Sequence, residues 1–98
     1  MISVVIPLYN KEAFIAETLE SVLSQTYSNF EVIVVDDGST DRSVAVVRSF
    51  SDDRISLFEK TNAGVSVARN YGVDQAKYPW IAFLDADDWW APTFLEEV

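Results

Sequence analysis

The sequence contains no cysteine and no histidine, and these two absences exclude several kinds of chemistry. Without cysteine there is no disulfide and no thiol nucleophile. Without histidine there is no Ser-His-Asp triad, no imidazole acid or base and no His-ligated zinc site. Thiol and imidazole chemistry are therefore ruled out.

Glycine-rich phosphate motifs and long apolar runs are missing as well. Neither G-x-G-x-x-G nor G-x-x-x-x-G-K-[ST] follows the first apolar segment, so the usual backbone cradles for phosphate are lacking. If the protein binds a nucleotide diphosphate, a cation held by carboxylates must neutralise the phosphates. No apolar run approaches the ~20 residues of a membrane span. No basic segment precedes the first apolar run, so we expect no signal peptide and a cytoplasmic location.

Composition and charge indicate a small acidic globular domain. The chain has 98 residues, which is one domain or less, and its 49% hydrophobic content argues against disorder. The net charge is −9 and the sequence pI is about 4.1. Such a balance argues against nucleic acid and anionic membrane surfaces as main partners.

Hydrophobic periodicity predicts strands that alternate with helices. Strands are expected at 2–6, 30–35, 55–58 and 80–84, and helices at 11–25, after 39–40 and at 64–77. Pro7 is expected to stop the first strand, Asn10 to cap the first helix, and Ser39 or Thr40 to cap the second. The order β-α-β-α-β-α-β predicts an α/β fold with a mostly parallel sheet and right-handed crossovers.

Acidic residues follow two of the predicted strands. Asp85-Ala86-Asp87 comes directly after the apolar run 80–84, which reads as a buried strand, and Asp36-Asp37 ends the run 30–35. Open α/β sheets bind ligands at the carboxyl edge of their strands. We therefore expect the two strand ends to converge on one pocket. Oxygen ligands of this kind suit Mg2+ or Mn2+.

Each motif also has a structural explanation. Acidic residues at strand ends are often turn formers. The segment Pro7-Leu8-Tyr9-Asn10 is either a strand stop with a helix cap or a rigid loop whose Tyr9 ring stacks on a base or ribose. Lys60 and Arg69 are either ordinary surface charges or cations that contact a phosphate or a base carbonyl.

Together these segments resemble the N-terminal half of the family-2 glycosyltransferases, which adopt the GT-A fold. The resemblance covers nearly the whole chain in family order. It implies a truncated three-layer α/β/α fold with a mostly parallel, Rossmann-like sheet. Residues 1–98 would be the N-terminal, nucleotide-sugar-binding part of a single domain. The matching segments are Val4-Val5-Ile6-Pro7-Leu8-Tyr9-Asn10, Leu19 to Tyr27, Glu31 to Asp41, Asn62-Ala63-Gly64 through Arg69-Asn70, and Phe83 to Asp88.

The resemblance implies roles on the nucleotide side of the pocket. Pro7 and Tyr9 would line it, with Tyr9 near the base or ribose. Glu12, at the start of the first helix, would lie in the same pocket. Asp37 would hydrogen-bond the base, with the N3–H of a uracil as the expected partner.

It also implies roles on the diphosphate side. Gly64 and Arg69 would lie near the base or the phosphates. Asp85 would contact the ribose or the metal shell. Asp87 would ligate the Mn2+ or Mg2+ that bridges the diphosphate.

The reaction that the resemblance implies is inverting sugar transfer from a nucleotide diphosphate sugar, expected to be a UDP-sugar, to a glycan or lipid-linked acceptor hydroxyl. Surface polysaccharide or glycan synthesis would be its setting, in the cytoplasm or at the cytoplasmic face of a membrane. The general base and acceptor half would lie beyond Val98, so we expect residues 1–98 alone to lack transferase activity. An exposed sheet edge would favour homo-oligomers.

Three other interpretations of the acidic strand ends are open. A phosphohydrolase with an aspartyl nucleophile normally carries its D-x-D after the first strand, whereas Asp85-Ala86-Asp87 follows the fourth. A receiver domain needs a phosphoacceptor Asp and a Lys on separate later strand ends, an order that this chain does not have. A nucleotide-binding or interaction module without catalysis remains the alternative.

Overall fold

A parallel β-sheet with helices on both faces forms the fold in the computed structural model, which describes residues 1–97. Within these residues the sheet has the strand order β3-β2-β1-β4, and each neighbouring pair is parallel. The elements are β1 (Ile2–Leu8), α1 (Ile15–Leu23), β2 (Phe30–Asp37), α2 (Ser43–Arg48), β3 (Ile55–Lys60), α3 (Val65–Gln75), β4 (Trp80–Phe83) and the 3-10 turn η1 (Leu95–Glu97).

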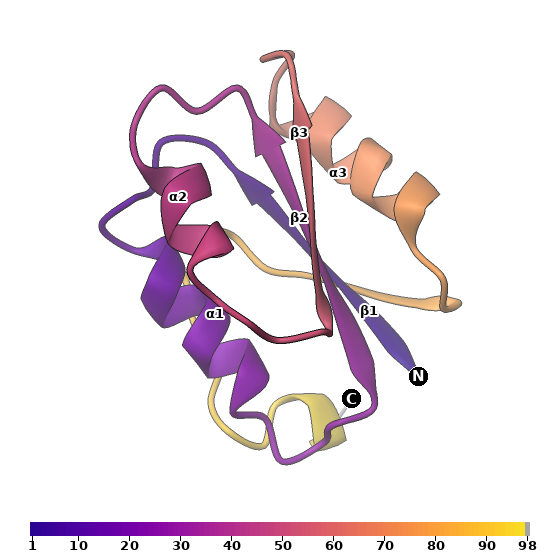
Figure 1. Cartoon of the computed structure of the whole chain (residues 1–98). Helices are drawn as coiled ribbons and strands as arrows, with labels where there is room; N and C mark the ends of the chain where they lie inside the picture. The colour runs from indigo at the N-terminus through magenta and orange to yellow at the C-terminus, as the bar shows by residue number, and fades with distance from the viewer. Residues whose placement is uncertain (98) are drawn as a thin grey trace.

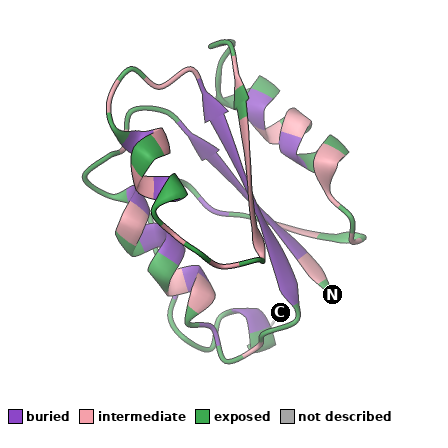
Figure 2. Ribbon diagram, viewed as in Figure 1, coloured by how far each residue is buried: buried purple, intermediate pink, exposed green. Residues whose placement is uncertain are grey.

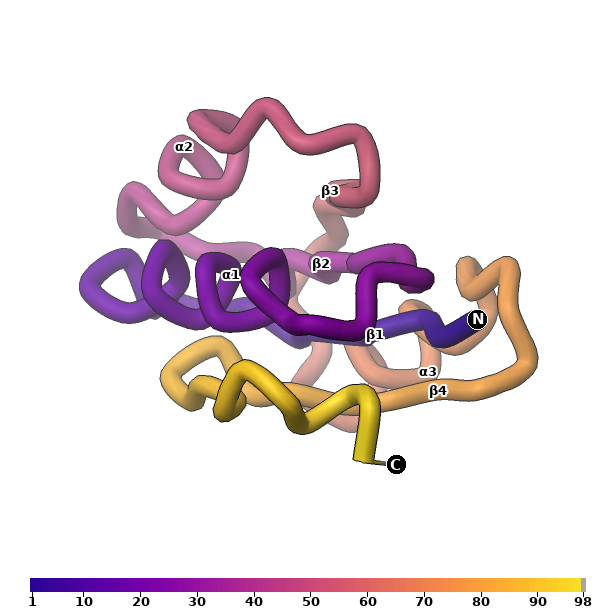
Figure 3. The backbone as a smooth tube through the Cα atoms, turned by 90° about the horizontal axis from the view of Figure 1, so that it is seen from below, coloured from indigo at the N-terminus to yellow at the C-terminus, as the bar shows by residue number. Residues whose placement is uncertain are grey.

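The helices lie in two layers because the chain reverses its winding direction after β3. The chain moves outward from β1 to β3 with α1 and α2 on one face, and it then returns over the other face through α3 to place β4 beside β1 (Figure 1). The view in Figure 3 separates α1 from α3 across the strands. The predicted α/β order and the three-layer parallel architecture are confirmed.

Two apolar clusters hold these layers together. Alternate side chains of a strand point to opposite faces, so Val4 and Ile6 pack with α1, while Val5 packs with α3. Strands β1 and β2 are buried along almost their whole length, as Figure 2 shows. Helix α3 approaches closely, since a Cβ added at Gly72 would lie 2.4 Å from Val5 Cγ1. The predicted continuous apolar strand 30–35 is therefore a central strand.

Three predicted boundaries are wrong, and each has a tertiary cause. Pro7 does not stop β1, which continues to Leu8. Proline is tolerated there because β4 pairs with β1 only as far as Val5, so the missing N–H of Pro7 faces no partner in β4. Asn10 does not cap α1, which begins at Ile15. Ser39 and Thr40 do not cap α2, which begins at Ser43. These polar side chains instead bond between loops.

Within residues 1–97, strand β4 has β1 as its single strand neighbour, and it is less buried than the sequence predicts. Its Trp80 and Phe83 are exposed, whereas the following Leu84 is buried. Hydrophobic periodicity in the predicted helices 11–25 and 64–77 places Phe14, Val65 and Val73 on the apolar faces, but these side chains are exposed. The apolar run 80–84 is predicted to be buried because hydrophobic periodicity does not show how many strand neighbours a strand has.

The route into β4 is fixed by a buried carboxylate at the amino edge of the sheet. Glu31 Oε2 accepts a hydrogen bond from the Ser3 hydroxyl at 2.6 Å and another from the Lys77 N–H at 2.7 Å. The Ser3 Oγ also accepts a bond from the Tyr78 N–H at 3.2 Å. The connection from α3 to β4 is thereby tied to β1 and β2, which sets the path of the chain toward Asp85.

We expect Glu31→Ala to destabilise the fold by about 1–3 kcal/mol, because it leaves the buried Ser3 hydroxyl and Lys77 N–H without their acceptor. Urea unfolding followed by tryptophan fluorescence measures the change. Glu20→Ala, at an exposed position of α1, is the control and should change stability by less than about 0.5 kcal/mol. Equal stability of the two variants would contradict the structural role of Glu31.

Candidate functional site

One cavity of about 480 Å³ opens at the carboxyl edge of the sheet, where β1 and β4 lie side by side and the winding reverses. The structure brings most of the predicted site residues to its wall. Its lining residues are Pro7, Leu8, Tyr9, Lys11, Asp37, Asn62, Gly64, Val65, Ala68, Arg69, Asp85, Ala86 and Asp87. The expected convergence of the two acidic strand ends is present.

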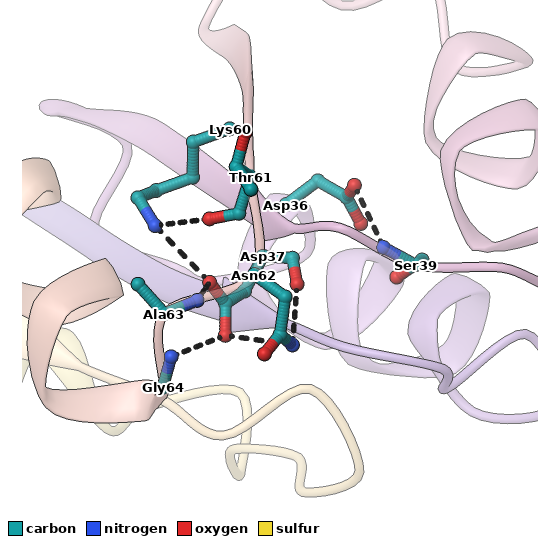
Figure 4. Close-up of polar contacts among 8 residues, drawn as sticks. All are labelled: Asp36, Asp37, Ser39, Lys60, Thr61, Asn62, Ala63 and Gly64. Atoms are coloured by element: carbon teal, nitrogen blue, oxygen red, sulfur yellow. Dashed lines mark hydrogen bonds and ion pairs between the residues drawn. The ribbon is translucent and has the colours of Figure 1, made fainter.

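Asp37, at the end of β2, is buried and densely hydrogen-bonded (Figure 4). Its Oδ1 accepts bonds from Lys60 Nζ at 3.2 Å and from the Ala63 N–H at 2.9 Å. Its Oδ2 accepts bonds from the Gly64 N–H at 3.0 Å and from Asn62 Nδ2 at 3.4 Å. The carboxylate therefore fixes the loop between β3 and α3.

These contacts keep Asp37 ionised. Burial alone would raise the pKa of Asp37, but the hydrogen bonds from Ala63, Lys60 and Gly64 outweigh burial and hold the pKa below its usual value of 3.8. Because the folded pKa lies below the unfolded one, the stabilisation is present at neutral pH and is lost as the pH falls through the folded pKa.

The turn before this loop requires glycine. Gly38 has φ +79°, in the left-handed region, and a Cβ there would lie 2.9 Å from the Asn62 backbone nitrogen. The turn is also shaped by Asp36, whose Oδ2 accepts the Ser39 N–H at 3.2 Å (Figure 4). The two neighbouring carboxylates thus face different loops, since Asp36 contacts its own turn and Asp37 contacts the β3–α3 loop.

Cations accompany the acidic residues that follow β4. Arg69 Nη2 lies 3.2 Å from Asp85 Oδ1, and Lys11 Nζ lies 3.3 Å from Asp87 Oδ2. Both carboxylates are solvent-accessible at the cavity mouth, with side chains 61% and 46% exposed respectively. Exposed pairs of this kind contribute little to stability, so the carboxylates can exchange these partners for a ligand.

Glu12 is the predicted site residue that the structure does not bring to the cavity. It is exposed and absent from the lining, and its backbone N–H donates to Asp41 Oδ2 at 3.2 Å. The helix was predicted to begin at residue 11, but α1 begins at Ile15. Glu12 therefore lies in the loop before α1, and its backbone N–H is directed at the loop before α2.

Comparison with known proteins agrees with this geometry. Residues 3–98 match the family described as Glycosyl transferase family 2. The chain belongs to this family. It is 42% identical over 97 residues to the glycosyltransferase GlyA of Streptococcus pneumoniae, covering 97% of this chain and 14% of that protein. It is 41% identical over 100 residues to an uncharacterised glycosyltransferase of Haemophilus influenzae, covering 99% of this chain and 40% of that one.

Solved structures share the fold. Staphylococcus aureus TarS 1-349 in complex with UDP-GlcNAc superposes with a TM-score of 0.92 at 34% identity, covering 98% of this chain and 29% of TarS. The mannosyltransferase PcManGT of Pyrobaculum calidifontis, in complex with GDP-Man and Mn2+, gives a TM-score of 0.86 at 32% identity, covering 93% and 29%. The fold is therefore of the GT-A, Rossmann-like type, and the chain spans less than half of each relative.

The acidic turn of this family-2 chain is anchored by α1. The buried Thr18 hydroxyl is directed at the carbonyl oxygens of Ala86, at 3.0 Å, and Asp88, at 2.6 Å. In the same helix, Ser21 Oγ accepts the Trp90 N–H at 3.2 Å, and just after the helix Gln25 Nε2 donates to the Ala91 carbonyl at 2.7 Å. Polar side chains of α1 and of the residues that follow it thus hold the segment after β4 in place.

Sequence reasoning missed two contributors to the site, Lys11 and Thr18. Lys11 reaches Asp87 because β4 lies next to β1, and this strand order could not be read from the sequence. Thr18 could have been noticed as a polar residue within an apolar helix stripe, next to Leu19 and Val22.

Among residues 1–97, no helix has the length and apolar character needed to cross a membrane.

We expect Thr18→Val, which is nearly isosteric, to destabilise the protein by about 1–3 kcal/mol because the Ala86 and Asp88 carbonyls lose their buried donor. Chemical unfolding measures the loss. Thr18→Ser keeps the hydroxyl and should recover most of it. Wild-type stability in Thr18→Val would contradict the anchoring role.

Proposed function

We propose that the protein transfers a sugar from a nucleotide diphosphate sugar to an acceptor hydroxyl, and that the cavity at the carboxyl edge binds the nucleotide of the donor. The proposal rests chiefly on the convergence of Asp37, Arg69, Asp85 and Asp87 on one cavity in a family-2 chain. TarS and PcManGT, which share the fold, have been solved with UDP-GlcNAc and with GDP-Man and Mn2+.

The nucleoside would occupy the side of the cavity formed by the ends of β1 and β2. Pro7 and Tyr9 line this side, and the Tyr9 ring is about half exposed, so a base or ribose can stack on it. Asp37 would accept a hydrogen bond from the base, with the N3–H of uracil as the proposed partner. The bond from Asn62 Nδ2 is the longest of the four at 3.4 Å and is the one that a base N–H would replace.

The diphosphate would lie toward β4, between the side chains of Arg69 and Lys11. Both line the cavity, and both are half-exposed and free to turn from a carboxylate to a phosphate oxygen. Gly64 lies at the start of α3 on the same wall. Because its position has φ +105°, glycine is the residue that suits it.

Asp85 and Asp87 would hold a divalent cation together with the diphosphate. Within residues 1–97 no cluster of three or more acidic side chains could enclose a metal ion by itself. Two solvent-accessible carboxylates nevertheless fit Mg2+ or Mn2+, which are often bound through one or two carboxylates plus substrate phosphates and water. When bound, the cation would supply Lewis-acid stabilisation of the leaving diphosphate.

We propose transfer with inversion, in which the acceptor oxygen attacks the anomeric carbon as the nucleoside diphosphate leaves. A carboxylate would take the acceptor proton. Asp37, Asp85 and Asp87 are each paired with a cation, so we assign the base to none of them. A glycan or lipid-linked acceptor, a role in surface polysaccharide synthesis and a cytoplasmic setting are proposals that rest on family membership.

The test is calorimetric titration of the protein with UDP, GDP and dTDP, with and without Mn2+. We expect Mn2+-dependent binding, strongest for UDP, that falls at least tenfold in Asp87→Ala because an ionic ligand is lost. Asp37→Ala should weaken binding at each metal concentration, because a base contact is lost and the loop at Gly64 loses its anchor.

Asp88→Asn is the matched control. Asp88 is adjacent to the proposed ligands, but its carboxylate accepts only the Trp89 N–H within the described chain and does not line the cavity. Nucleotide binding that is indifferent to Mn2+ would refute the metal role of Asp85 and Asp87. If the full-length protein binds the nucleotide but transfers no sugar, the alternative is favoured, namely a nucleotide-binding module without catalysis.

We also propose self-association through β4. This strand has one free edge within residues 1–97, and Trp80 is 71% exposed on it. Multi-angle light scattering should show a mass that rises with protein concentration, and Trp80→Lys should restore the monomer mass. A monomer at all concentrations would contradict this proposal.

A further inference from the structure

Three consecutive backbone N–H groups of the loop between β1 and α1 donate hydrogen bonds to residues 39–43, which form the loop after β2 and the first residue of α2. The Asn10 N–H donates to Ser39 Oγ at 3.0 Å, and the Lys11 N–H donates to Ser43 Oγ at 2.9 Å. The Glu12 N–H donates to Asp41 Oδ2 at 3.2 Å. All three acceptors are side-chain oxygens.

A return contact runs in the opposite direction. The Thr40 N–H donates to Asn10 Oδ1 at 2.8 Å, and Asn10 itself has φ +49°, in the left-handed region that asparagine tolerates. A non-glycine residue stays there only when its surroundings determine the conformation. The bonds on both sides of Asn10 provide that constraint.

Asp41 and Ser43 are the centre of this contact. Asp41 Oδ1 accepts the Ser43 N–H at 2.9 Å, so one carboxylate joins the start of α2 to the β1–α1 loop. Ser43 is fully buried. Burial would raise the pKa of Asp41, but its hydrogen bonds from Ser43 and Glu12 outweigh burial and lower the pKa. The carboxylate is therefore ionised at neutral pH.

We propose that Asp41 and Ser43 are positioning residues that lock the β1–α1 loop and thereby set Tyr9 and Lys11 at the donor cavity. Tyr9 and Lys11 both line the cavity and flank Asn10, the residue whose backbone is held. Lys11 links the loop contact to the cavity, since its backbone N–H donates to Ser43 while its Nζ lies 3.3 Å from Asp87.

These hydrogen bonds also indicate how a chain without a glycine-rich loop would contact a phosphate group. In glycine-rich loops the backbone N–H groups after the first strand point at the phosphates. Here the N–H groups of residues 10–12 all donate to side-chain oxygens of residues 39–43. The loop would therefore meet a diphosphate through the Lys11 ammonium group and not through its backbone.

The inference rests on the proposed function, and the test separates the two. Calorimetry with UDP and Mn2+ is compared among wild type, Asp41→Ala and Asp41→Asn. Without the Asp41 carboxylate, the β1–α1 loop would adopt the binding conformation only about a tenth of the time, and the affinity for UDP would fall roughly tenfold in Asp41→Ala. Asp41→Asn should recover part of it, because the amide oxygen can still accept one of the two N–H groups.

A double-variant background distinguishes positioning from general damage. In protein carrying Tyr9→Ala and Lys11→Met, Asp41→Ala should have little further effect on affinity, because the residues that it positions are gone. Amide hydrogen exchange should show faster exchange at Glu12 in Asp41→Ala while amides of β1 stay protected. Where Asp41→Ala does not fold, Ser43→Ala is measured in the same way, with the Lys11 amide as the reporter.

Asp52→Ala is the matched control. Asp52 also accepts backbone and side-chain hydrogen bonds, which lower its pKa, but its partner is Arg54 at the amino edge of the sheet, away from the cavity. It should leave UDP affinity unchanged. Wild-type affinity in both Asp41→Ala and Ser43→Ala would overturn the inference, as would an undiminished loss in the double-variant background. No UDP binding by wild type would instead refute the proposed function.

Discussion

The site depends on the buried Asp37 carboxylate, which is paired with Lys60 and bound by backbone N–H groups of the β3–α3 loop. The chain carries 16 acidic and 7 basic residues, yet three of those cations stand beside Asp37, Asp85 and Asp87. The Asp37 pair is buried and fixed by backbone donors, whereas the other two pairs are solvent-exposed. Removing a partner from a buried pair is far more costly than from an exposed one. The site thus combines a rigid inner carboxylate with two outer carboxylates that can exchange partners.

The reversal of winding after β3 places these pairs together. Because α3 crosses the opposite face and returns the chain to β1, the turn after β4 lies beside the loop after β1. Lys11 and Asp87 are distant in sequence and are neighbours only for this reason. The buried Glu31 network at the amino edge and Thr18 at the carboxyl edge guide the chain on either side of β4. The outer half of the site therefore depends on contacts made well away from it.

Hydrophobic periodicity in the sequence predicts the helices and strands well but places their first and last residues poorly. Strands β1 and β2 carry apolar runs long enough to identify a buried parallel sheet, and the acidic strand ends correctly indicate the edge at which the cavity opens. The ends failed because Asn10, Ser39 and Thr40, which resemble helix caps, are used in bonds between loops. Side-chain oxygens serve local and distant N–H groups equally well, so sequence alone does not show which they bind. Pattern also gave no strand order, and Lys11 was missed for that reason.

The two loops that follow β1 and β2 have divided roles. The loop after β2 binds the β1–α1 loop through the side-chain oxygens of Ser39 and Asp41. Asp37, the last residue of β2, binds the β3–α3 loop at Ala63 and Gly64. The end of β2 and the loop after it are therefore linked to both neighbouring walls of the cavity. A glycine-rich loop would present bare backbone to a phosphate, but here the backbone donors maintain loop geometry. If the cavity binds a diphosphate as proposed, its recognition would depend on the Lys11 and Arg69 side chains and on a cation held by Asp85 and Asp87. Loop geometry and anion contact would then depend on different groups.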